Sequence, residues 1–315
     1  MAKLKFDQDR AVEIFRYAVD AWEQKKLGYG KLKQSEVEHM PESIRYGSLD
    51  HRRWIFFGAA VNRYGQASNR AMAKFAKSIG IDPRLIDPMS DFENVDYHQL
   101  LSGVMGFVSA NSELGKEGKL RISGWQRNLA TLRDKYNGDP GEVILRAERT
   151  RDGLIKAFAE PFYGVATKVA QLAIIWFQDV NWSYRKKTWE KIRQIEVMPV
   201  DLWILRFIRQ WGIVTGWDTD QHDAVRLPTS EFISQICNEY GIDHSKLSNA
   251  FWHCGQICVK RPQNPNRVAW YCCDNCPFDQ YCSCICTGSM YKVNGTMNWN
   301  FAHKRRPSGI NKFDF

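Results

Sequence analysis

Apolar residues recur at helical spacing along most of the chain. In residues 168–177 they follow i, i+3, i+4, i+7 and i+8, the pattern of a helix that buries one face. They are Val169, Leu172, Ala173, Trp176 and Phe177. The same periodicity, interrupted by turn-forming Pro and Gly residues, predicts an all-α fold. Helices are expected at residues 9–25, 50–63, 67–79, 97–107, 122–136, 140–149, 154–160, 168–178, 182–191, 199–211, 228–240 and 243–254.

Two of these helix starts carry a residue type that does chemistry. Lys168 lies in the first turn of the helix after Pro161–Gly164, and Asp201 precedes the apolar face of a later helix. A helix start binds phosphate and disfavours the charged form of a nearby amine. An amine that attacks carbon must be neutral, so Lys168 is a candidate nucleophile. The simpler alternatives are a solvated lysine and an aspartate that serves only as an N-cap.

The cysteines form a second candidate site. Eight of the nine fall between Cys254 and Cys286, and Cys237 lies in an apolar helical run where it is expected to be core. Four of the eight have metal-ligand spacing: Cys258, Cys273, Cys276 and Cys282. Four thiolates spaced in this way hold zinc or an iron–sulfur cluster. A disulfide framework is disfavoured, because no signal peptide is expected and the cysteines are confined to one stretch.

Charge points to a nucleic-acid partner. The chain has 44 Lys and Arg against 35 Asp and Glu, a net charge of +9. Residues 251–315 hold eight of the cations and three of the acids, so this part carries +5. The loop after Cys258 places Lys260, Arg261 and Arg267 where a metal cluster would present them to phosphates. The alternative is a solvated, proline-stiffened loop. No apolar run approaches the length of a membrane span.

The two helix starts together resemble the helix-hairpin-helix DNA glycosylases. The hairpin of that family is similar to residues 162–170, and its later V-P-V-D segment is similar to residues 198–201. The resemblance implies that Lys168 is the nucleophile and Asp201 its acidic partner. It also implies that backbone amides at Gly164 and Ala166 bind a DNA phosphate. Ala166 stands where the family has glycine, and alanine suits this position only if its φ stays negative.

Within the family the signals divide between two branches. Thr167-Lys168-Val169-Ala170 resembles the 8-oxoguanine glycosylases, whereas the cysteines resemble the endonuclease III branch, whose [4Fe–4S] cluster is bound by C-x6-C-x2-C-x5-C. The last three ligands match at full spacing, and the first loop is eight residues longer. Cys254 competes with Cys258 as first ligand, and Cys272 with Cys273. Cys284 and Cys286 have no assigned role. Structural zinc is the alternative to the cluster.

The resemblance covers about residues 50–282 and implies two helical domains with the active site in the cleft between them. Residues 50–195 would form a six-helix domain that contains the hairpin. Residues 1–49 and 196–286 would form a discontinuous iron–sulfur domain, and residues 287–315 a basic C-terminal tail.

Two further positions follow from the resemblance. Asn62 would be the wedge that fills the gap left by a flipped base, with a helix C-cap as the equal alternative. Residues 135–139, Lys-Tyr-Asn-Gly-Asp, resemble the turn before the family's hairpin. This turn is expected to be structural, because Asn-Gly accepts the left-handed conformation of a helix exit.

The sequence therefore predicts a monomeric DNA glycosylase with abasic-site lyase activity, acting on duplex DNA that contains a modified base. The alternatives are a monofunctional glycosylase that uses water and a non-catalytic nucleic-acid-binding protein with zinc. A cytoplasmic or nucleoid-associated location is expected, or a nuclear one in a eukaryote. No spacing rule names the excised base.

Overall fold

The computed structural model describes residues 4–61, 68–101, 104, 116–216, 222–260, 269–271, 276–282, 284–293 and 296–305. The chain divides into two compact units. Unit 1 comprises Met1–Leu32 and Val200–Phe315, and unit 2 comprises Lys33–Pro199. The sequence had suggested a continuous part between residues 50 and 195; the continuous unit of the structure runs from residue 33 to residue 199.

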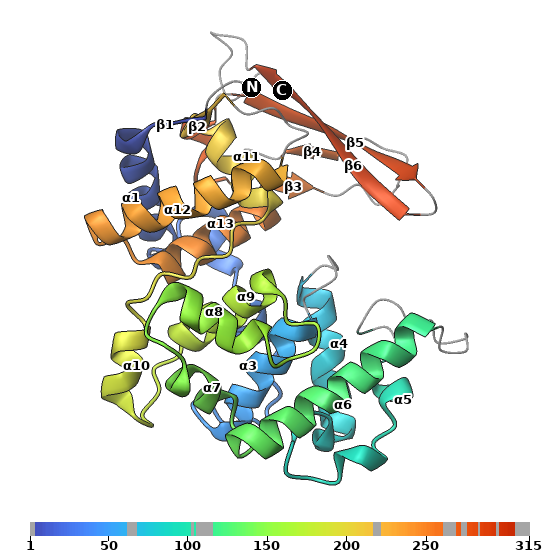
Figure 1. The fold of residues 1–315 in the computed structure, drawn as a ribbon. Helices are drawn as coiled ribbons and strands as arrows, with labels where there is room; N and C mark the ends of the chain where they lie inside the picture. Colours follow the sequence, from blue (N-terminus) through green and yellow to red (C-terminus); the bar gives the residue numbers. More distant parts are fainter. Residues whose placement is uncertain are drawn as a thin grey trace. The chain divides into compact units, whose positions relative to one another are not determined.

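All the regular elements in the described part of unit 2 are helices (Figure 1). Its elements are α2 (Ser35–Glu38), α3 (Leu49–Val61), α4 (Ser68–Ile81), η3 (Pro83–Ile86), η4 (Phe92–Asn94), α5 (Tyr97–Leu101), α6 (Lys116–Tyr136), α7 (Pro140–Arg146), α8 (Arg151–Ala159), α9 (Thr167–Asp179) and α10 (Lys186–Ile192).

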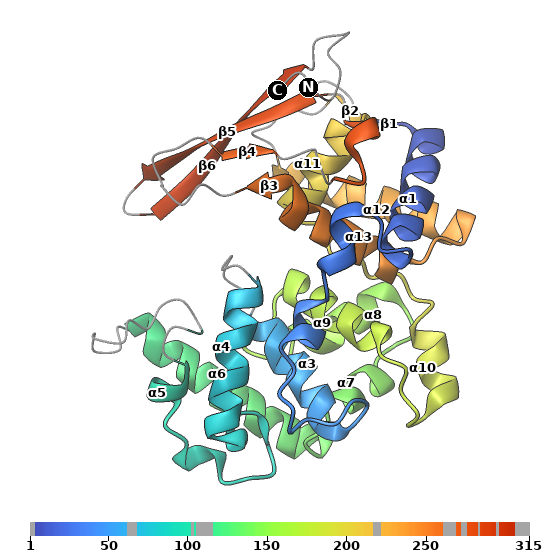
Figure 2. The ribbon, with the colours of Figure 1, turned by 180° about the vertical axis from the view of Figure 1, so that it is seen from behind.

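Helix α3 is the centre of unit 2. It packs against α4, α7 and α9, and Figure 2 shows it beside α4 and α9. Because neighbours cover it on several sides, nearly all of its residues are buried, including two arginines. Aromatic rings fill the space around it: Trp54 stacks on Phe75 at 5.4 Å, and Phe57 lies 4.7 Å from Trp125.

Unit 1 combines helices with short and long strands. Its elements are β1 (Lys5–Phe6), α1 (Gln8–Glu23), η1 (Leu27–Lys31), α11 (Leu202–Gln210), β2 (Val214–Thr215), α12 (His222–Tyr240), α13 (His244–Cys258), β3 (Val259–Lys260), β4 (Ala269–Tyr271), η5 (Asp279–Tyr281), β5 (Cys284–Val293) and β6 (Thr296–Arg305). Helix α1 packs on α12 and α13, and β1 pairs antiparallel with β2.

The mostly helical prediction is confirmed, and the helices lie close to where the periodicity placed them. Two details differ. Helix α12 begins at His222, six residues before Pro228, although a proline was expected to start it. The short helix α2 was not predicted, because four residues are too few to show a period.

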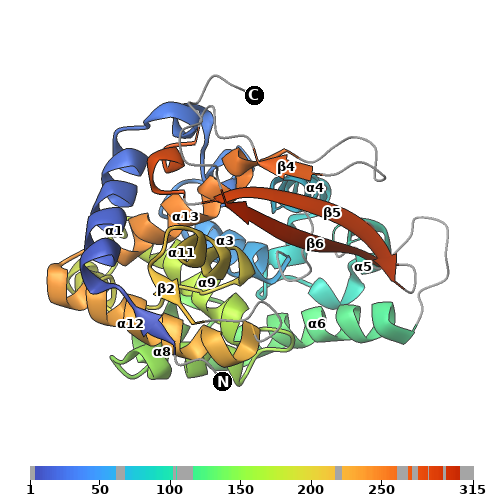
Figure 3. The same ribbon diagram turned by 90° about the horizontal axis from the view of Figure 1, so that it is seen from above.

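The C-terminal strands are a correction. Strands β3, β4, β5 and β6 form an antiparallel sheet in that order, of which Figure 3 shows β4, β5 and β6. Residues 287–293 and 296–305 therefore belong to strands rather than to the expected basic tail. The overlooked signal is local: Val293 pairs with Thr296, and Asn294-Gly295 between them is the dipeptide most favoured in two-residue hairpins.

Candidate active site

The segment around Lys168 is a turn between two packed helices, α8 and α9. Thr150 caps α8 through a bond from the Gly153 N–H, at 3.0 Å. Inside the turn, Phe162 and Val165 are buried, and Gly164 has a φ of +76°, which only glycine adopts without strain. The sequence thus folds into a helix-turn-helix because apolar residues fix both sides of a left-handed glycine.

Ala166 has the negative φ that an alanine needs at this position of the hairpin. It is the N-cap residue of α9 with φ −76°, and no side chain caps the helix there. Ala166, Thr167 and Lys168 are all exposed, whereas Val169 and Ala170 are buried. Lys168 is therefore the second residue of α9, on the exposed side of its first turn.

The turn is held in place by α6, a contact that the sequence did not reveal. The side-chain amide of Asn128 accepts a hydrogen bond from the Tyr163 N–H at 2.7 Å and donates one to the Tyr163 carbonyl at 3.0 Å. Gly124 makes room for the Tyr163 ring, since a Cβ there would lie 1.9 Å from a ring carbon. The Arg127 guanidinium lies 5.7 Å from the same ring. Asn128 thus sets the position of the backbone five residues before Lys168.

Asp201 belongs to unit 1 and caps α11. Its Oδ1 accepts a hydrogen bond from the Ile204 N–H at 3.0 Å, and its carbonyl accepts one from Leu205 at 3.1 Å. The residue is buried, with 7% of its surface exposed. The N-cap contact that the sequence offered as the simpler alternative is thus present. A capping carboxylate can also act on a substrate, so this contact leaves the chemical role to experiment.

The chain between α10 and Asp201 is anchored to α9. The buried Gln178 amide donates to the carbonyls of Ile192, at 2.9 Å, and Ile195, at 2.8 Å. One turn after Lys168, the Gln171 amide lies 3.5 Å from the Met198 carbonyl. The helix that begins at Lys168 therefore also holds the segment that leads toward Asp201.

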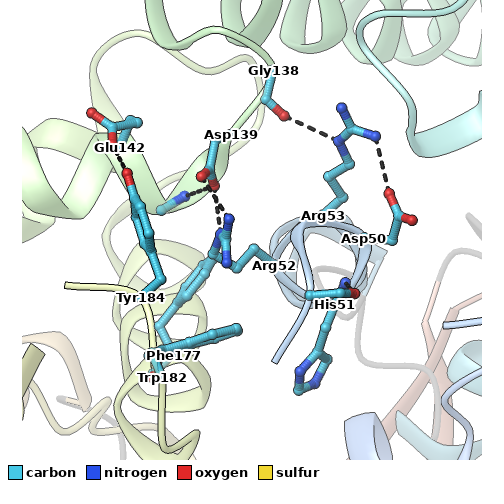
Figure 4. Close-up of polar contacts among 12 residues, drawn as sticks. Asp50, His51, Arg52, Arg53, Gly138, Asp139, Glu142, Phe177, Trp182 and Tyr184 are labelled. Carbon is cyan, nitrogen blue, oxygen red and sulfur yellow. Dashed lines mark hydrogen bonds and ion pairs between the residues drawn. The ribbon is translucent and has the colours of Figure 1, made fainter. Parts of the chain in front are cut away.

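A buried ion pair fixes the turn between α6 and α7 (Figure 4). Arg52 of α3 donates to both carboxylate oxygens of Asp139, at 2.7 and 2.8 Å, and the Gly141 N–H donates to the same carboxylate at 2.8 Å. Asn137 and Gly138 have φ values of +51° and +71°. The structural role predicted for this Asn-Gly turn is confirmed.

Cys276 and Cys282 bracket a short segment of unit 1 that packs through its aromatic residues. Cys276 is buried, and Phe278, two residues later, packs against Trp211 at 4.5 Å and Phe251 at 6.4 Å. The Gln210 amide donates to Cys282 Sγ at 3.4 Å. Helices α11 and α13 thus hold the Cys276–Cys282 loop. Cys254, the competing first ligand, is fully buried on α13.

The complete ligand set extends beyond what the structure describes. Cys273 lies outside the described residues, and Cys258 is described only as the last residue of α13. Within the described residues, no three Cys, His, Asp or Glu side chains come together as a metal site. Cys276 and Cys282 offer sulfur donors that suit zinc or an iron–sulfur cluster, and the choice between the two stays a prediction.

Most of the predicted DNA contacts outside the hairpin also lie beyond this description. Asn62, Arg261 and Arg267 are outside the described residues, and Lys260 is described only as part of β3. Among the described helices, none combines the length and apolar character needed to cross a lipid bilayer.

Comparison with known proteins assigns no family. No family model matches the chain. A stretch of 140 residues is 23% identical to Catalase B of Aspergillus fumigatus, which is 44% of this chain and 19% of Catalase B. The chain thus matches about a fifth of that relative's length. Likeness of this extent carries no activity across, and the functional argument rests on the site residues.

Proposed function

We propose that this protein is a DNA glycosylase with abasic-site lyase activity that uses Lys168 as its nucleophile. The observation that carries the proposal is the helix-turn-helix of α8 and α9, which exposes Lys168 in the first turn of α9. The left-handed Gly164 and the negative φ of Ala166 are the backbone features that a phosphate-binding hairpin requires. The net charge of +9 favours binding to duplex DNA.

The chemistry assigned to Lys168 begins with DNA bound and a modified base flipped out of the stack. The neutral Nζ attacks the sugar's C1′ and forms a C–N bond. The bond from C1′ to the base breaks, and the base leaves with the electron pair and takes up a proton. Loss of the amine's proton and opening of the sugar ring give a Schiff base. Loss of a C2′ proton then expels the 3′ phosphate and cuts the strand.

Asp201 is assigned the electrostatic role. An ionised carboxylate stabilises the positive charge that grows on the sugar as the base departs, and it accepts the proton of the attacking amine. The mechanism requires Lys168 and Asp201 to reach the same sugar. Within unit 2, the helix that carries Lys168 also holds the chain as far as Met198, three residues before Asp201.

Cys258, Cys273, Cys276 and Cys282 are the proposed ligands of a [4Fe–4S] cluster, with zinc as the alternative. A bound cluster would supply rigidity and no hydrolytic chemistry. It would hold Lys260, Arg261 and Arg267 in place beside DNA. Absorbance near 400 nm with bound iron supports the cluster, and stoichiometric zinc without that absorbance excludes it.

The proposal is tested by incubating the protein with end-labelled duplexes, each carrying one modified base, in the presence of borohydride. We expect a covalent protein–DNA adduct with at least one base, and its loss in Lys168→Gln. Lys156→Gln, an exposed lysine of α8, is the matched control and should form the adduct normally. Alkali-sensitive abasic sites without an adduct would instead mean a monofunctional enzyme that uses water. Neither product on any duplex would contradict glycosylase activity on those bases.

A further inference from the structure

Residues 193–199, between α10 and the boundary of unit 2, form no helix or strand. Val197 and Met198 are nonetheless fully buried. Buried backbone groups need hydrogen-bond partners, which regular structure does not provide here. Side chains provide several of them. Gln178 and Gln171 of α9 approach carbonyls of the segment, and Glu196 accepts a bond from the Met198 N–H at 2.6 Å.

Glu196 differs from the two glutamines because it is an acid. Only 4% of its surface is exposed, and its Oε2 lies 3.8 Å from Nε of Arg151, the first residue of α8. Its other oxygen, Oε1, accepts the hydrogen bond from the Met198 N–H. One carboxyl group thus joins the segment to the first helix of the hairpin, while the glutamines join it to the second.

Burying an ionised carboxylate at this contact costs free energy. A glutamine could accept the bond from Met198 without the penalty of burying a charge. Burial raises the pKa of Glu196 to about 7, even though the nearby Arg151 guanidinium and the bond from the Met198 N–H both lower it. A perturbed acid in a segment that contacts both helices of the proposed hairpin is more typical of a functional position than of a purely structural one.

We propose that Glu196 is a positioning residue for base excision, which holds the segment leading into Asp201 against both helices of the hairpin. This inference rests on the proposed function. The anchored part of the segment ends at Met198, three residues before Asp201. Three residues of extended chain span at most about 11 Å, so the contact at Met198 fixes the point in unit 2 from which the chain runs on to Asp201. Loss of this anchor would loosen Asp201 without removing any group that touches DNA.

The test compares Glu196→Ala and Glu196→Gln on the duplex that the wild type cleaves. Glu196→Ala should lower the single-turnover rate of base excision at least about tenfold, since misplacement by about an ångström costs up to a hundredfold. Its DNA dissociation constant should stay within about threefold of wild type. Borohydride trapping on a preformed abasic site should also persist, because Lys168 is intact and no base remains to be expelled. Glu196→Gln keeps the acceptor for Met198 and should recover most of the rate.

Two controls keep the inference separate from the proposed function. Glu160→Ala removes an exposed acid at the end of α8 and should excise at the wild-type rate. If the wild type acts on no duplex, the proposed function fails before Glu196 is tested. A wild-type excision rate in Glu196→Ala would overturn the positioning role, as would a parallel loss of binding and trapping. If Glu196→Ala does not fold, Gln171→Leu removes the contact at the Met198 carbonyl. It should lower excision and spare binding, and an unchanged rate would overturn the inference.

Discussion

Removal of the Asp139 carboxylate gives the strongest prediction for stability. Asp139 accepts three hydrogen bonds, two from Arg52 at 2.7 and 2.8 Å and one from the Gly141 N–H at 2.8 Å. The Arg52 and Asp139 side chains are only 9% and 12% exposed. Asp139→Ala would therefore leave the Arg52 charge buried and unmatched, between rings of Trp182 and Tyr184 that cannot replace a carboxylate.

The magnitude follows from two contributions. Removing one partner of a buried ion pair costs about 3–5 kcal/mol. Asp139 is also the N-cap residue of α7, and loss of such a cap costs about 1 kcal/mol. The two contributions share a carboxylate and do not simply add, so we expect a loss of about 4 kcal/mol. At roughly 2–4 °C per kcal/mol for a domain of this size, the melting temperature should fall by about 10 °C.

Urea unfolding followed by far-ultraviolet circular dichroism measures this loss. Asp139→Asn keeps an oxygen for the Gly141 N–H and should lose less, about 1–3 kcal/mol. Glu190→Ala breaks an exposed pair with Lys186 on α10 and should change stability very little. In a double-mutant cycle with Arg52→Met, the coupling energy should exceed about 1 kcal/mol. A loss below about 1 kcal/mol in Asp139→Ala, or an additive double mutant, would show that the buried ion pair does not stabilise the fold as described.

Three further predictions concern the candidate site. Asp201→Asn should have the same unfolding free energy as the wild type, because asparagine is an equally good N-cap. Its single-turnover rate of base excision should fall at least about 100-fold. A normal excision rate would mean that Asp201 serves only as a cap. Gly164→Ala should lower the free energy of unfolding in urea by about 1–2 kcal/mol, because φ at Gly164 is +76°. Gly80→Ala should lose nothing, because Gly80 lies in helix α4 with open space around the added Cβ. Equal effects of the two changes would contradict the left-handed turn. Burial raises the pKa of Glu196 from 4.5 to about 7, so its contribution to stability is complete below pH 4.5 and falls as the pH rises through 7. From pH 5 to pH 8 the wild type should therefore lose about 2.5 kcal/mol relative to Glu196→Gln, and a pH-independent difference between the two would contradict this.

The sequence predicts local features well where the pattern is strong. The apolar period located the main helices, and Asn137-Gly138 and Ala166 adopt the backbone conformations that their residue types suggested. In β6 the apolar residues Met297, Trp299 and Phe301 alternate with polar ones, which is a strand pattern that helical periodicity does not detect.

The contacts that hold the candidate site together are not visible in the sequence, because they join distant residues. Asn128 and Tyr163 are 35 positions apart, and Arg52 and Asp139 are 87 apart. Glu196 lies in a segment without a helix or strand, where an acid is usually solvated. Only packing shows that this acid is buried, and burial is what changes its chemistry.

The proposed chemistry depends on a covalent bond between Lys168 and DNA. Borohydride fixes the Schiff base as a stable amine, so digestion of the trapped adduct and mass spectrometry of its peptides locate the bond. We expect the sugar remnant on the peptide containing Lys168, and no adduct with Lys168→Gln. A remnant on another lysine or on the N-terminal amine, with trapping preserved in Lys168→Gln, would contradict this expectation.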